Sequence, residues 1–74
     1  MKTEIAQKIS DEMNEIMARL NDSIWLVMDN CEESEFQGYR GAVAHIMAAV
    51  IEVTNSLYQK NPEVKPAGYD DADA

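Results

Sequence analysis

Apolar residues recur at helical spacing in two long stretches of the chain. In the first stretch they are Ile5, Ile9, Met13, Met17, Leu20, Ile24, Val27 and Cys31. From Met13 onward the steps alternate between four and three, which is the heptad pattern of packed helices. Ile5 and Ile9 fall outside that frame and indicate a stutter, a local change in the phase of the repeat. If Ile16 replaces Met17 in the pattern, the steps fit an eleven-residue repeat instead, and the sequence does not decide between the two.

The second stretch carries an unbroken heptad. Its positions are Phe36, Tyr39, Val43, Ile46, Val50, Val53 and Leu57. The two patterns predict one helix from about Thr3 to Asn30 and another from about Glu35 to Lys60. The second helix should end at Asn61, because the residue before Pro62 is pushed out of the helical region.

Capping signals mark the starts of both predicted helices. The hydroxyl of Thr3 can accept a hydrogen bond from an amide of the first turn, so we expect Thr3 to be an N-cap. Ser34 stands three residues before Gln37, which is the spacing of a capping box. We therefore expect a short acidic turn at residues 31–34.

A turn this short makes residues 1–61 an antiparallel hairpin of two helices, an all-α fold. If the turn centres near Glu32, facing residues have numbers that sum to about 64. The expected pairs are Met28 with Phe36, Trp25 with Tyr39, Leu20 with Val43, Met17 with Ile46, Met13 with Val50, Ile9 with Val53 and Ile5 with Leu57.

Residues 62–74 contain two prolines and three aspartates and predict an acidic tail that is extended or disordered. The alternative is that Val64 and Tyr69 anchor the tail to the helices.

The second predicted helix is apolar over more of its circumference than one neighbour can cover. Beside its heptad lies a second strip of small or apolar residues: Gly41, Ala44, Ala48 and Ile51. Together the two strips cover roughly 220° of the helix, against about 100° for a typical surface helix. We predict that a second hairpin covers this strip, which gives a homodimeric four-helix bundle. The alternative is that a different protein covers this strip.

Composition narrows the class of protein further. The chain has 74 residues, 14 of them acidic and 6 basic, and a net charge of -8, which argues against binding to nucleic acid. A single cysteine excludes a disulfide framework. The first residues contain no apolar signal segment, and the longest apolar-rich run, residues 42–51, is too short to cross a membrane. We expect a cytoplasmic protein that does not associate with membranes.

Candidate chemical groups are few. His45 lacks the Glu-x-x-His spacing of a di-iron bundle, because position 42 is alanine. The thiol of Cys31 lies among carboxylates, which disfavour a reactive thiolate. The acidic turn lacks the spacing and the glycine of a calcium loop. Met13, Met17 and Met28 fall on or beside the first heptad, which favours core filling over a ligand-binding surface. We therefore expect no enzyme activity, no cofactor and no metal.

Three segments of the sequence resemble a set of small bacterial helical proteins of unknown function. The features are an acidic cysteine turn at residues 31–35, a Glu-Phe-x-x-Tyr-Arg helix start at residues 35–40 and a Pro-x-x-Lys-Pro-x-Gly exit at residues 62–68. The resemblance covers about half of the chain. It implies no activity and no site. The leading hypothesis is a homodimeric protein-interaction module, either an adaptor or a small regulatory subunit. The alternative is a small acidic chaperone or antitoxin-type partner that covers a basic protein.

Overall fold

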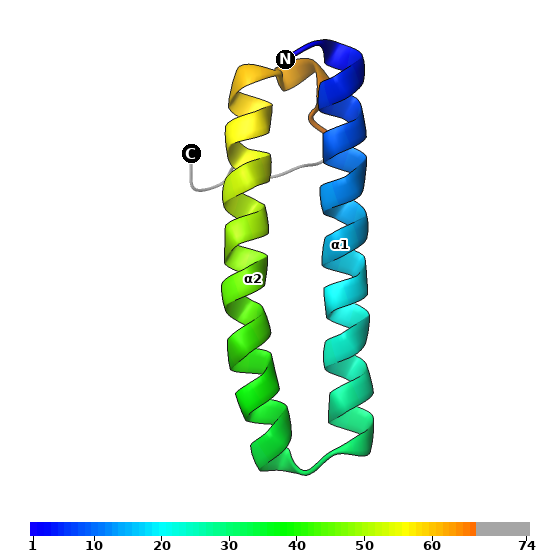
Figure 1. Ribbon diagram of the computed structural model, residues 1–74, viewed down its shortest axis with the longest axis vertical. Helices are drawn as coiled ribbons and strands as arrows, with labels where there is room; N and C mark the ends of the chain where they lie inside the picture. Colours follow the sequence, from blue (N-terminus) through cyan, green and yellow to red (C-terminus); the bar gives the residue numbers. More distant parts are fainter. Residues whose placement is uncertain (67–74) are drawn as a thin grey trace.

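The computed structural model describes residues 1–66, and within this range the fold is a helical hairpin without strands. Helix α1 spans Thr3–Asn30, helix α2 spans Glu33–Lys60, and a short 3-10 helix, η1, spans Pro62–Val64. The two long helices lie side by side and antiparallel, with η1 near the start of α1 (Figure 1). The predicted all-α hairpin is confirmed.

Only Cys31 and Glu32 connect the two helices, and both have extended backbone angles. Because the link has two residues, α2 begins at Glu33, two residues before the expected start. A capping box joins Glu32 and Glu35, so the predicted Ser34–Gln37 box is wrong. The side chain of Gln37 instead donates a hydrogen bond to Glu33, with 2.6 Å between Nε2 and Oε2.

The contact surface of α1 runs through two small residues near its start. Ala6 and Ser10 have no exposed surface, whereas Ile5 is 42% exposed. The remaining positions of this seam are the buried or half-buried Met13, Met17, Leu20, Ile24 and Val27. From Ala6 onward the steps are four and three without interruption, so the predicted stutter is wrong.

The small residues of α1 make room for Tyr58, the largest buried side chain of α2. Ala6, Leu57, Tyr58 and Val64 form one buried cluster, and Ile9 packs against it. The Tyr58 hydroxyl shares a hydrogen bond with the Ser10 hydroxyl, so the polar end of the ring is satisfied inside the core. An isoleucine at either small position would occupy the space that the ring fills.

The contact surface of α2 is rotated relative to the sequence prediction. It uses the buried or half-buried residues Val43, Met47, Val50, Thr54 and Leu57. Ile46 and Val53, which the heptad placed in the seam, are 49% and 46% exposed. Thr54 enters the seam in place of Val53 at little cost, because its hydroxyl bonds the carbonyl of Ile51 at 3.0 Å.

The rotation also overturns some of the expected pairs at the turn end. Trp25, expected to face Tyr39 in the seam, is 54% exposed and so is not part of the buried contact. The Tyr39 hydroxyl instead donates a hydrogen bond to the Ser23 hydroxyl at 2.8 Å. Met28 is 40% exposed, so it does not fill the core as predicted.

Helix η1 lies across the end of the hairpin opposite the turn, which we call the open end (Figure 1). Asn61 is buried and donates hydrogen bonds to the Leu57 carbonyl from both its backbone and its side chain. Val64 is 4% exposed and belongs to the Tyr58 cluster. Thr3 does not cap α1, since Lys2 is the N-cap, and its hydroxyl donates to the Glu63 carboxylate at 2.8 Å. Residues 62–64 are therefore helical and anchored by Val64, whereas the proposed anchor Tyr69 lies outside the described residues.

The bond between Ser10 and Tyr58 predicts energetic coupling between the two hydroxyls. Tyr58→Phe and Ser10→Ala should each lower the free energy of unfolding by about 1 kcal/mol, because a buried hydroxyl loses its partner. The double variant should lose less than the sum, with a coupling energy of about 1 kcal/mol. Urea denaturation, followed by circular dichroism at one protein concentration, measures all four proteins. Strictly additive losses would contradict the bond.

The contact of η1 with α1 predicts a pH dependence at Glu63. Hydrogen bonds from the backbone and from the Thr3 hydroxyl lower the pKa of the Glu63 carboxyl below its ordinary value. The carboxylate therefore stabilises the folded state at pH above that ordinary value, and the contribution disappears as the pH falls through the lowered pKa. In Thr3→Val the pKa should rise toward the ordinary value, and in Thr3→Ser it should stay low. Carbon NMR titration of the carboxyl measures each pKa, and an unchanged value in Thr3→Val would refute the assignment.

Candidate functional site

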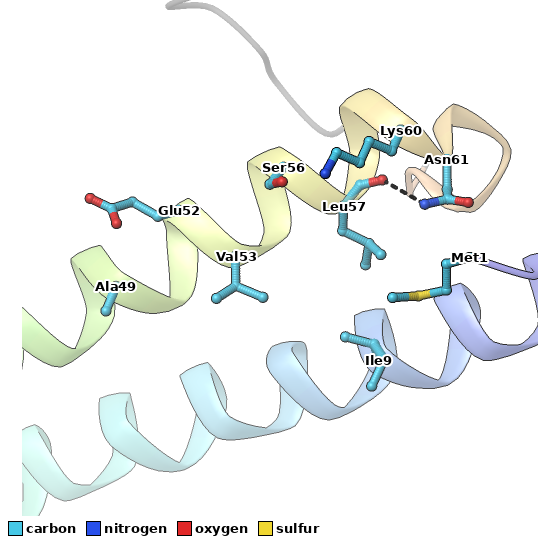
Figure 2. Close-up of a pocket in the computed structure, with 9 residues that line it drawn as sticks. All are labelled: Met1, Ile9, Ala49, Glu52, Val53, Ser56, Leu57, Lys60 and Asn61. Carbon is cyan, nitrogen blue, oxygen red and sulfur yellow. Dashed lines mark hydrogen bonds between the residues drawn. The ribbon is translucent and has the colours of Figure 1, made fainter.

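An open groove lies between the two helices at the open end of the hairpin (Figure 2). Its volume is about 690 Å³. The lining residues are Met1, Ile9, Ala49, Glu52, Val53, Ser56, Leu57, Lys60 and Asn61. Met1 and Ile9 approach the groove from the N-terminal segment and α1, and Val53 and Leu57 approach it from α2 (Figure 2). The floor is thus apolar, and the charged side chains among the lining residues, Glu52 and Lys60, both come from α2.

The groove continues into an exposed apolar surface along one side of the hairpin. On α2, Tyr39, Ile46 and Val53 are seven residues apart and therefore share one side of the helix. On α1, Ile9 and Ile16 have the same spacing, and Ser23 follows seven residues later. Two contacts place both rows on the same side of the molecule: the shared groove at one end and the Tyr39–Ser23 hydrogen bond at the other.

We call this surface the groove face. It comprises Ile9, Ile16 and Ser23 of α1 with Tyr39, Ile46, Ala49 and Val53 of α2. Ile16, Ile46 and Val53 are 37%, 49% and 46% exposed. Large aliphatic side chains seldom form a continuous solvent-exposed row on a protein that has no partner. An extended apolar patch of this kind commonly marks an interaction site.

The strip predicted from the sequence as an interface lies on a different part of α2. Gly41, Ala44, Ala48 and Ile51 are all exposed, and nothing lies within 4 Å of a side chain that could be built at Gly41. Ala44 and Ile51 each precede a residue of the groove face by two positions, which is about 200° around a helix. The hairpin therefore offers two separate apolar surfaces for a partner. The sequence prediction missed the groove face because it assigned Ile46 and Val53 to the hairpin core.

The chemical groups singled out in the sequence do not converge on one place. His45 and Cys31 are both exposed, and Cys31 is a free thiol. Within residues 1–66 no three His, Cys, Asp or Glu side chains lie together in a way that could hold a metal ion. Neither of the long helices is long and apolar enough to cross a membrane.

Charge is distributed unevenly along the hairpin. The lysines of residues 1–66 all lie toward the open end: Lys2, Lys8, Lys60 and Lys65. Exposed acidic residues gather at the turn end: Asp29, Glu32, Glu33 and Glu35. Between the ends, Arg19 and Glu15 of α1 form an ion pair at 2.7 Å on the exposed surface. The turn end is therefore strongly acidic, whereas the open end mixes these lysines with Glu4, Glu52 and Glu63.

Comparison with protein-family models, curated proteins and solved structures finds no match for this chain. Function is therefore inferred from the surface of the hairpin itself.

Exposure of Cys31 at the turn predicts rapid labelling of the folded protein. One thiol per chain should react with a small disulfide reagent without denaturant, at a rate within about tenfold of the unfolded chain, because access does not limit the reaction. Absorbance of the released thiolate measures the rate with and without urea. Labelling that requires urea would show that another part of the assembly covers the turn.

Proposed function

We propose that this chain is a non-enzymatic protein-interaction module that works as a homodimer, with two hairpins packed as a four-helix bundle. The observation that carries the proposal is the groove face, an apolar surface that runs along both helices. Each square ångström of apolar surface left in water forfeits about 25 cal/mol, so covering this face with a partner is favourable.

The dimensions of the hairpin suit an interface of ordinary size. The molecule measures 45 Å by 23 Å by 19 Å along its principal axes. A stable interface buries about 800 Å² on each partner. A face 45 Å long and up to 23 Å wide supplies that area only if the partner covers most of its length. Another helical hairpin has the length to do so.

The polar interior supports a structural role over catalysis. The buried polar side chains are Ser10, Thr54 and Asn61, and each makes a hydrogen bond within the hairpin. No buried side-chain nitrogen or oxygen of residues 1–66 is left without a partner. Active sites commonly hold titratable groups in strained or unsatisfied surroundings, whereas Tyr58, a titratable side chain of the described core, has its hydroxyl bonded to Ser10.

A second candidate function rests on the turn end. Trp25 and Leu26, in the last turns of α1, are 54% and 65% exposed, and the acidic residues Glu32 and Glu33 follow at the turn. An exposed indole at the same end of a hairpin as several carboxylates is suited to a basic amphipathic segment of another protein. This arrangement favours a small acidic chaperone or antitoxin-type partner as the alternative. Association with such a segment should slow markedly as salt is raised, because opposite charges steer the encounter.

Sedimentation equilibrium tests the homodimer directly. At micromolar concentration we expect a mass of twice the 8.3 kDa of one chain. Native mass spectrometry should give the same stoichiometry. A folded 8.3 kDa monomer that persists at 100-fold higher concentration would overturn the homodimer and leave a different protein as the partner.

A further inference from the structure

We infer that the groove face takes a second copy of this chain in the antiparallel orientation, so that the turn of each copy lies beside the open end of the other. The inference rests on the proposed function and specifies the surface and the geometry of the dimer. Three features of the hairpin support it: the order of residues along the groove face, the shape of its two ends and their charge.

The order of residues along the groove face is symmetric about the middle of each helix. Helix α2 spans Glu33–Lys60, so Ile46 lies at its midpoint, with Tyr39 and Val53 seven residues to either side. Helix α1 spans Thr3–Asn30, so its midpoint falls at Ile16. A two-fold axis that lies in the plane of the interface, perpendicular to the helices at this level, turns the two groove faces toward each other and brings the isoleucines of both copies together at the centre. It also brings Tyr39 of one copy to the height of Val53 in the other.

The same operation matches the shapes of the two ends. The open end contains the groove between Ile9 and Val53. The turn end presents the ring of Tyr39, which is 36% exposed and held in place by its hydrogen bond to Ser23. In the antiparallel dimer each ring lies over the groove of the other copy. A parallel dimer would place groove against groove and leave the apolar floors unfilled.

Charge selects the same orientation. An antiparallel pair brings the acidic turn, with Glu32 and Glu33, beside the open end, with Lys2 and Lys60. A parallel pair would bring the acidic turns of both copies together. Like charges within the screening length of about 8 Å disfavour that arrangement. The repulsion between two acidic turns therefore adds to the mismatch of shape against the parallel orientation.

Spin labels at Cys31 test the orientation, because the described hairpin holds its thiol at the turn. In the antiparallel dimer the two labels lie at opposite ends of the bundle. Each helix has 28 residues, so double electron–electron resonance on the labelled wild-type dimer should give about 40 Å or more, at 1.5 Å per residue. A distance under about 25 Å would show a parallel dimer and overturn the inference.

Two matched substitutions on α2 test the surface. Ile46 and Ala48 are both exposed in the single hairpin, so a glutamate at either position leaves the hairpin able to fold, which circular dichroism checks. Ile46→Glu should raise the dimer dissociation constant at least about 100-fold, because it buries an unpaired charge. Ala48→Glu should change it less than about threefold.

The outcomes separate the inference from the function on which it rests. A wild-type dimer that Ala48→Glu dissociates and Ile46→Glu does not would move the interface to Gly41, Ala44, Ala48 and Ile51, and the inference would fail while the homodimer stands. A wild-type protein that stays monomeric would overturn both, and the groove face would then belong to a different protein.

Discussion

The burial of one tyrosine ring sets the geometry of this hairpin. Tyr58 lies in the core at 4% exposure, and its hydroxyl needs a polar partner there. Ser10 provides that partner, and Ala6 leaves room for the ring. These two small residues therefore fix which side of α1 faces α2. Val64 of η1 packs into the same cluster, so the end of the hairpin is closed by the contacts that set its rotation.

The rotation of α2 about its axis determines which of its side chains remain exposed to solvent. Once Tyr58 and Leu57 both face α1, Thr54 occupies the seam one turn earlier and Val53 turns toward solvent. Ile46 follows Val53 outward, because the two are seven residues apart on one side of the helix. The hairpin thus places Ser10 and Thr54 in its internal contact, while Ile16, Ile46 and Val53 stay exposed. Such a row of exposed aliphatic side chains is unusual for a helix pair that has no partner.

The sequence predicts the two helices and their antiparallel order well, because apolar spacing and the stop at Pro62 are strong local signals. It does not predict the rotation, because the Ile46–Val53 row and the Met47–Thr54 row are both heptads. The sequence prediction uses the more apolar row, whereas the packing of Tyr58 favours the other. The same prediction missed the groove face, because it assigns Ile46 and Val53 to the core. The sequence signal that reveals it is the four-residue spacing of Ala6 and Ser10, two small residues in a seam that is otherwise large.

The two-residue link between the helices determines that α2 pairs with the α1 of its own chain. Only the extended backbone of Cys31 and Glu32 separates this hairpin from one uninterrupted helix of nearly sixty residues. In such a rod α2 would leave its own α1 and pack on that of a neighbouring chain, which is domain swapping. The Glu32–Glu35 capping box stabilises the break. The two residues of the link are therefore the place where the chain separates internal helix pairing from exchange between chains.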